Sequence, residues 1–234
     1  PRECDLHLIE KVRHCHAAPK ILQRRSDFMP VTIEYFYTHV SPWAYFGHAA
    51  FLDLATLHGA TVVFRPVNLG GVFDASGGMP LAKRHPVRQA YRLVELQRWR
   101  EKRNLPLNIH PSHFPADPTL ADCCALALVE HGGPVAAFSE KAFRHIWADE
   151  GDLNDRASLK ALAEAVGADG DRMLAGADSA EIKAIYAENQ ARAIELGVIG
   201  SPCYVLQGEP FWGQDRLELL ADALASGRAP YMPV

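Results

Sequence analysis

In the segment Ser41-Pro42-Trp43-Ala44, the hydroxyl of Ser41 is the first side-chain group along the sequence whose position suits a role in binding or catalysis. Serine is a favoured N-cap and proline suits the first helical position, so Ser41-Pro42 indicates the start of a helix. A helix N-terminus presents unpaired N–H groups and a partial positive charge, and here a hydroxyl donor lies beside them. That combination suits a bound anion or a thiolate supplied by a ligand. A plain helix cap accounts for the same residues, so both interpretations stay open.

A second segment, Gly200-Ser201-Pro202, has a proline that opens a strand after a turn. A cis peptide bond before Pro202 would expose the main-chain N–H and C=O of Ser201 as an edge for an extended peptide ligand. A trans bond is the commoner state, and the sequence alone leaves the choice open.

A third segment, Phe211 to Arg216, combines a glycine with two polar side chains. Gly213 would let the backbone approach a ligand closely. The amide of Gln214 and the carboxylate of Asp215 would suit an amino-acid end that carries an ammonium group. Asp215 would serve equally well as a helix cap.

The elements around Ser41 follow a strand-helix-strand pattern. β-Branched and aromatic residues from Val31 to Thr38 predict a strand. Apolar positions then recur at helical spacing as far as His58-Gly59, a typical helix end. Thr61 to Val67 predicts a second strand, and the short links predict a right-handed βαβ unit.

The middle of the chain predicts a series of helices broken by prolines and glycines. Their expected ranges are Val87–Arg103, Leu120–His131, Val135–Ala148, Arg156–Val166 and Ala180–Leu196. Strand signals return at Cys203–Leu206 and around Phe211-Trp212, joined by a turn at residues 207–209, and an amphipathic helix over Arg216–Ala225 closes the chain.

This order, βαβ, then helices, then ββα, predicts an α/β fold. Residues 29–75 and 197–234 are expected to form a thioredoxin-like domain, and residues 76–196 a large all-helical insertion domain. Residues 1–28 show no period of 2 or 3.6 and are expected to be a disordered leader, with the natural start close to Met29.

Composition argues against several functional classes. The 234 residues carry 24 Lys+Arg and 28 Asp+Glu, a net charge of -4 without a basic block, so no nucleic-acid partner is expected. No stretch approaches the ~20 apolar residues of a membrane span, and no secretory signal begins the sequence. A cytoplasmic protein without a membrane partner is therefore expected.

The cysteines do not form a redox motif. In a thioredoxin-like frame a C-x-x-C pair would sit at the start of the first helix, and here those positions hold Ser41 and Ala44. Neither can form a mixed disulfide, so dithiol exchange there is excluded. Cys123-Cys124 is expected in the core, and no metal site is expected because no cluster has a complete ligand set. A working sulfur at Ser41 would have to arrive with a ligand.

Together, these segments, in this order and at these distances, resemble the 2-hydroxychromene-2-carboxylate isomerase family, glutathione-dependent proteins of the DsbA-like thioredoxin fold related to kappa-class glutathione transferases. The resemblance covers residues 31–226 and includes Leu96-Gln97-Arg98-Trp99 and Pro111 to Pro115. It implies glutathione as cofactor, a role in the catabolism of aromatic compounds and, in many members, a homodimer.

The resemblance also implies roles for single residues. Ser41 matches the family's active-site serine, whose hydroxyl would hydrogen-bond the glutathione sulfur and help to keep it a thiolate. Ser201 matches the residue before the cis-proline, whose main chain would pair with the cysteinyl part of glutathione. The γ-glutamyl end would be held by the matching segment, Trp212, Gly213, Gln214 and Asp215.

By the same resemblance, an aromatic carboxylate substrate would be held from the Gly-rich loop of residues 70–85 and from the helical insertion. The matching positions are Phe73, Lys83, Arg84 and Phe114. The sequence departs from the family in two places. Thr38-His39-Val40 lacks an acidic residue that many members carry near position 38, and Phe73 replaces a cationic residue that would meet the substrate's carboxylate.

The implied mechanism uses the glutathione thiolate as a reversible nucleophile toward a carbon conjugated with the substrate's carbonyl. Basic groups such as Lys83 or Arg84 would hold the carboxylate and a developing oxyanion. Two alternatives stay open: a kappa-like glutathione S-transferase that releases a stable conjugate, and a non-catalytic protein that binds glutathione or a peptide. Consumption of glutathione during turnover distinguishes the transferase, and an unchanged thiol pKa of bound glutathione indicates the non-catalytic protein.

Overall fold

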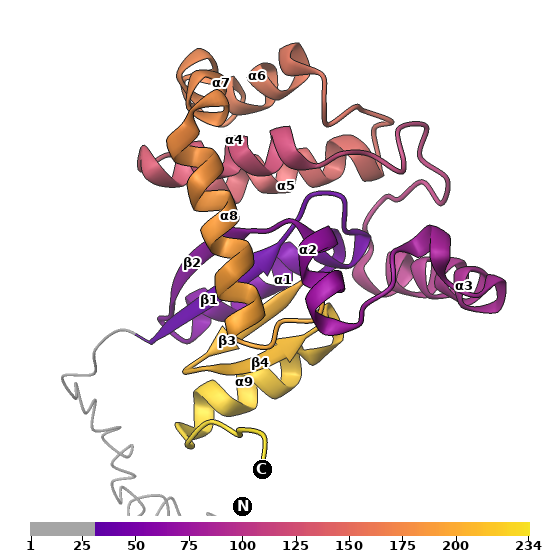
Figure 1. The fold of residues 1–234 in the computed structure, drawn as a ribbon, viewed down its shortest axis with the longest axis vertical. Helices are drawn as coiled ribbons and strands as arrows, with labels where there is room; N and C mark the ends of the chain where they lie inside the picture. Colours follow the sequence, from indigo (N-terminus) through magenta and orange to yellow (C-terminus); the bar gives the residue numbers. More distant parts are fainter. Residues whose placement is uncertain (1–30) are drawn as a thin grey trace, which may run out of the picture.

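A four-stranded sheet in the order β2-β1-β3-β4 organises residues 31–234, the part of the chain that this computed structural model describes (Figure 1). The strands are β1 (Thr32–Tyr37), β2 (Thr61–Pro66), β3 (Cys203–Leu206) and β4 (Glu209–Trp212). β1 is parallel to β2 and antiparallel to β3, and β3 and β4 form a hairpin. The leader expected at residues 1–28 lies outside the described residues.

Both faces of the sheet are buried because side chains of β1 alternate between two clusters. Tyr35 faces α1 (Pro42–Leu57), where the Phe51 ring centroid lies 4.7 Å from that of Tyr35. The next residue, Phe36, faces the other way and packs in a second cluster with Val72 of α2 (Leu69–Ser76) and Ala193 of α8 (Ala180–Glu195). The sheet is therefore the middle layer of an α/β sandwich, as the fold class required.

The remaining helices belong to the insertion and to the end of the chain. They are α3 (Pro86–Arg103), α4 (Thr119–Glu130), α5 (Val135–Trp147), α6 (Arg156–Glu164), α7 (Gly170–Asp178) and α9 (Leu217–Ser226). Figure 1 shows α4 to α7 gathered at one end, α8 returning from them along the sheet, and α3 standing apart beside it. The predicted fold, a thioredoxin-like α/β unit with a helical insertion, is confirmed.

The structure adds elements that the sequence pattern did not predict. The Gly-rich loop expected at residues 70–85 overlaps α2, which begins at Leu69, where Asn68 accepts a hydrogen bond from the Gly70 amide at 2.9 Å. Gly71 allows this helix to lie against α8, since a Cβ there would overlap the Gln190 side chain. α7 is also new and is capped by Asp169.

One turn is shorter than the pattern indicated. Gln207 and Gly208 alone form the β3–β4 turn with positive φ values of 51° and 89°, and Glu209 already belongs to β4. Two-residue turns of this handedness match the twist of a hairpin. Along residues 31–234, no helix combines the length and the apolar character that crossing a membrane requires.

Candidate active site

The first and second segments meet at the carboxyl end of β1. The Ser41 hydroxyl donates to the main-chain carbonyl of Ser201 at 2.9 Å, and the Ser201 hydroxyl accepts from the amide of Thr38 at 3.2 Å. The peptide bond between Ser201 and Pro202 is cis. The third segment joins them because the Gly213 amide donates to the Pro202 carbonyl at 2.9 Å. Residues that are far apart in the chain therefore share one site.

Ser41 is the N-cap of α1 and is nearly buried. Its oxygen accepts a hydrogen bond from the Ala44 amide at 3.2 Å while its proton points to Ser201. The first turn of α1 contains no acidic residue, so no side-chain carboxylate of that turn neutralises the positive end of the helix. A hydroxyl polarised in this way can donate to an anion or to a thiolate beside the helix start.

A cleft of about 600 Å³ opens beside this site, between α3 and the β4–α9 connection. Its aromatic lining comes from Trp43, Tyr91, Trp99 and Trp212, and its polar lining includes Ser201, Gln214, Asp215 and several arginines. A larger hollow of about 1170 Å³ lies at the opposite end of the sheet, beside Val31 and Gly208. It contains none of the predicted site residues, so the smaller cleft is the candidate site.

Gly213 has a backbone conformation that only glycine adopts readily. Its φ is 107°, and a Cβ at this position would overlap a carboxylate oxygen of Asp215. Asp215 is half-exposed at the cleft and pairs with Arg216 at 2.6 Å. Trp212 lies over Gly200, where a Cβ would meet the indole nitrogen at 2.5 Å. Two glycines therefore shape the wall that the third segment forms.

Gln214 is almost fully buried, and Arg103 holds its side chain. The Arg103 guanidinium donates to Gln214 Oε1 at 2.8 and 3.1 Å and to the Gln214 main-chain carbonyl at 3.1 Å. The amide oxygen of Gln214 is thus occupied, and its NH₂ group remains to donate. Arg103 also lies 5.4 Å from the ring centroid of Trp99 in the cleft wall. The sequence contained no signal for this contact, which spans 111 residues.

The residues expected to hold the substrate are scattered. Arg84 lines the cleft and donates from Nε to the Met79 carbonyl at 2.7 Å. Lys83 is exposed at the end of a short 3₁₀ turn, and Phe73 packs against Gly78. Neither lines the cleft, because the unpredicted α2 and the turn after it direct them elsewhere.

Phe114 also lies behind the cleft wall rather than in it. Its ring centroid is 5.1 Å from that of Trp147, and the guanidinium of Arg92 lies 5.3 Å above it. Arg92 itself lines the cleft, together with Arg88, and no motif indicated either of them.

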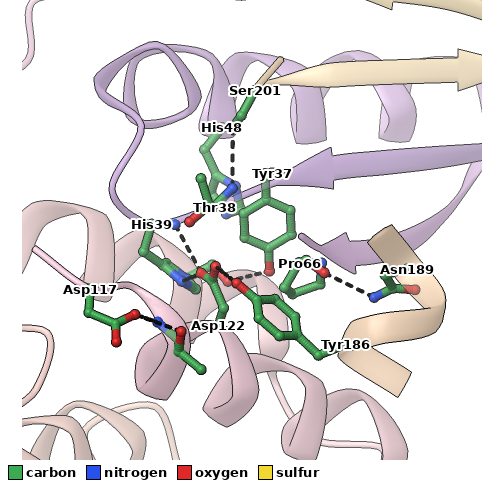
Figure 2. A network of polar contacts seen from close by, with 12 residues as sticks. Tyr37, Thr38, His39, His48, Pro66, Asp117, Asp122, Tyr186, Asn189 and Ser201 are labelled. Atoms are coloured by element: carbon green, nitrogen blue, oxygen red, sulfur yellow. Dashed lines mark hydrogen bonds and ion pairs between the residues drawn. The ribbon is translucent and has the colours of Figure 1, made fainter. Parts of the chain in front are cut away.

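The loop between β1 and α1 is held by a buried polar network, shown in Figure 2. Asp122 of α4 accepts from the His39 amide at 3.0 Å, and its distance to His39 Nδ1 is 2.7 Å. Tyr186 donates to the second carboxylate oxygen at 3.0 Å, and Trp147 Nε1 donates to the His39 carbonyl at 3.2 Å. The helical insertion thus supplies a carboxylate beside this loop, in which residue 38 is a threonine and not an acidic residue. The contacts to His39 hold the backbone that leads into Ser41.

The described cysteines cannot supply a thiolate at this site. Cys123, Cys124 and Cys203 are free and buried. Burial raises the pKa of Cys123 to about 11 and the pKa values of Cys124 and Cys203 to about 12, so all three are neutral thiols near pH 7. The core position predicted for Cys123-Cys124 is confirmed. Among residues 31–234, no group of three His, Cys, Asp or Glu side chains is arranged to hold a metal ion.

Comparison with known proteins agrees with this fold. Residues 32–225 match the family model of the DSBA-like thioredoxin domain. The chain is 30% identical over 198 residues to a 2-hydroxychromene-2-carboxylate isomerase of Sphingobium xenophagum, across 84% of this chain and 99% of the relative. It is 25% identical over 213 residues to glutathione S-transferase kappa 1 of Homo sapiens, across 84% of this chain and 92% of the relative.

A solved structure of a 2-hydroxychromene-2-carboxylate isomerase superposes with a TM-score of 0.71 at 26% identity and covers 83% of this chain and 95% of that chain. The similarity therefore extends beyond the sheet into the helical insertion. The chain belongs to the DsbA-like thioredoxin proteins, in the family of the 2-hydroxychromene-2-carboxylate isomerases.

Proposed function

We propose that this protein is a glutathione-dependent isomerase that acts on an aromatic carboxylate of the 2-hydroxychromene-2-carboxylate type. One observation carries the proposal: the Ser41 hydroxyl lies at the start of α1, one hydrogen bond from Ser201, where this fold would otherwise hold an attacking cysteine. The described cysteines are buried and protonated, so none of them supplies a thiolate there, and the sulfur is assigned to a ligand. Similarity to an isomerase and to a kappa-class transferase supports the same choice.

The residues around Ser41 fit a glutathione molecule. The Ser201 carbonyl accepts one hydrogen bond from Ser41, and a carbonyl oxygen can accept a second from a peptide N–H. Gln214, whose oxygen Arg103 occupies, would donate its NH₂ group to the α-carboxylate of the γ-glutamyl end. Asp215 would accept from the ammonium group beside it. Gly213 leaves room for both because it has no Cβ.

When bound, glutathione supplies a thiolate able to add reversibly to a carbon conjugated with a carbonyl. Ser41 would turn its proton from the Ser201 carbonyl to the sulfur and so stabilise the charged form. The Ala44 amide supports this by donating to the same hydroxyl oxygen, and the positive end of α1 adds to the effect. Preorganised donors of this kind lower the thiol pKa because they favour the anion.

The cleft walls suit a planar aromatic acid. Trp43 and Trp99 offer apolar faces, and Arg84 offers a cation for the carboxylate. Arg84 could also stabilise negative charge that develops on the substrate's oxygen during the reaction.

The test is the isomerisation of 2-hydroxychromene-2-carboxylate with and without glutathione. The concentration of glutathione is measured before and after the reaction. We expect turnover to require glutathione and to leave its amount unchanged. Ser41→Ala should reduce turnover by a factor on the order of 10²–10³, the loss expected for one preorganised donor.

Ser179→Ala is the matched control because Ser179 also caps a helix, accepting from the Ile182 amide at 3.1 Å, but lies outside the cleft. Both variants should lose about 1 kcal/mol of stability through the lost cap, and only the Ser41 variant should lose turnover. Full turnover in Ser41→Ala, or turnover without glutathione, would refute the proposal. Stoichiometric consumption of glutathione would identify a transferase instead.

A further inference from the structure

One wall of the cleft carries a row of arginines, Arg84, Arg88 and Arg92. Arg88 and Arg92 are one turn apart on α3 and share a face of it, and Arg84 lies just before the helix begins. Within residues 31–234, none of the three forms an ion pair with a carboxylate.

The acidic groups of the same cleft are already paired with other cations. Glu95 pairs with Arg98, and Asp215 pairs with Arg216. The arginine row therefore has no counter-charge inside the protein among the described side chains. A cation that is partly removed from water without a counter-charge is unfavourable, and a bound anion removes that cost.

Partial burial and neighbouring positive charge act on two members of this row, Arg84 and Arg92. Partial burial, followed by the charge of Arg84, lowers the pKa of Arg92 to about 10, and Arg92 has the ring of Phe114 at 5.3 Å below its guanidinium. Partial burial, followed by the charge of Arg88, lowers the pKa of Arg84. The cations are thus close enough to repel one another, which is a sign that they serve a ligand rather than the fold.

The position of Arg88 on its helix leads to the same conclusion. It lies in the first turn of α3, where no acidic residue occurs and where the helix dipole disfavours a cation. The last turn of the same helix holds Arg100, Lys102 and Arg103, where cations are favourable. Helix stability therefore explains the basic residues at the end of α3 but not Arg88.

We propose that two arginines of this row bind the acid groups of the substrate, and that this substrate is an aromatic acid of the proposed class that carries a second anionic group beside its carboxylate. The number of anionic groups in this inference rests on the proposed function, because bound glutathione brings two carboxylates of its own. The α-carboxylate of glutathione is assigned to Gln214, and the glycine carboxylate would neutralise one arginine of the row. Two arginines remain for the substrate, between aromatic side chains that suit a planar ring.

Isothermal titration calorimetry of the full chain with phthalate, benzoate and benzamide tests this. The three probes share one ring and carry two, one and no carboxylates. We expect phthalate to bind about tenfold more tightly than benzoate, and benzamide to bind least, since each charged contact of about 1.4 kcal/mol changes affinity tenfold. Arg92→Gln and, separately, the more exposed Arg88→Gln should each abolish the preference for phthalate.

Arg172→Gln is the matched control because Arg172 is exposed on α7, outside the cleft, and the preference should survive there. Equal binding of phthalate and benzoate, or a preference that persists in both cleft variants, would overturn the inference. Glutathione binding is measured separately. If glutathione binds and the preference is absent, only this inference fails. If glutathione does not bind, the proposed function fails and with it the count of two anionic groups, while a preference for phthalate would still assign acid groups to the arginine row.

Discussion

The hydroxyl of Ser41 donates to the carbonyl of Ser201 across 2.9 Å, and this hydrogen bond joins positions 160 residues apart. It connects the start of α1 with the turn that leads into β3. The proton of the hydroxyl is therefore already directed at the edge where a peptide-like ligand would pair. The proposed activity depends on this relationship and on the parts of the molecule that hold it in place.

Gly213→Ala should weaken glutathione binding and the fold. The new Cβ would overlap the Asp215 carboxylate in a backbone with φ of 107°, so we expect a loss of about 1–3 kcal/mol in unfolding free energy. Gly208→Ala is the control because Gly208 has a φ of 89° and a Cβ there would meet no atom within 4 Å. Calorimetric titration with glutathione should show weaker binding only for the Gly213 variant; equal affinities would contradict the placement of the γ-glutamyl end.

Arg103→Met should raise the KM for glutathione about tenfold while kcat changes little. The guanidinium holds both oxygens of Gln214, and without it the amide can turn its oxygen toward the ligand. Arg100→Met in the same turn of α3 is the control. Steady-state kinetics measure both constants. A fall in kcat with unchanged KM would contradict this prediction and show that Arg103 acts on the reaction itself.

Tyr186→Phe should destabilise the protein by about 1–3 kcal/mol, because it removes a donor from the buried carboxylate of Asp122. Tyr231→Phe, at an exposed position, should change stability by less than about 0.5 kcal/mol. Urea unfolding measures both. If the two variants are equally stable, the network in Figure 2 does not anchor the helical insertion to the loop before Ser41.

Stability should fall as the pH drops from 6.5 toward 4. Burial lowers the pKa of His48 to about 4, so the folded protein keeps the imidazole neutral while the unfolded chain takes up a proton below pH 6.5. The linked loss approaches about 3 kcal/mol, and it is absent above pH 6.5. Urea unfolding across this range should show a flatter dependence for His48→Gln than for the wild type, whereas His110→Gln, an exposed site, should keep the wild-type slope. An unchanged slope in His48→Gln would assign the pH dependence to other groups.

The three segments that we assign to glutathione could be picked out from the sequence because their signals are local. A serine before a proline, a Ser-Pro pair at a strand start and a glycine before two polar residues each specify a short backbone geometry. The sheet and most helix limits followed from periodicity for the same reason. The structure brings these segments together, with Ser41, Ser201 and Gly213 linked directly or through Pro202.

The cleft lining that we assign to the substrate could not be predicted because it depends on how separate elements pack. The face of α3 that turns toward the cleft, with Arg88 and Arg92, is set by contacts of α3 with α1 rather than by its own pattern. The double glycine at residues 70–71 indicated a loop, but close packing against α8 makes it part of a helix. The contact between His39 and Asp122 joins residues 83 positions apart, and neither segment contains a sequence signal that predicts it.

The most direct test of the central claim is the thiol pKa of glutathione bound to the protein, followed by the ultraviolet absorbance of its thiolate as the pH is raised. For the wild type we expect a pKa clearly below that of free glutathione, because Ser41 and the start of α1 favour the anion. For Ser41→Ala the pKa should move back toward the free value while glutathione still binds. An unshifted pKa in the wild type, with glutathione bound, would contradict the claim that this site activates a sulfur carried by its ligand.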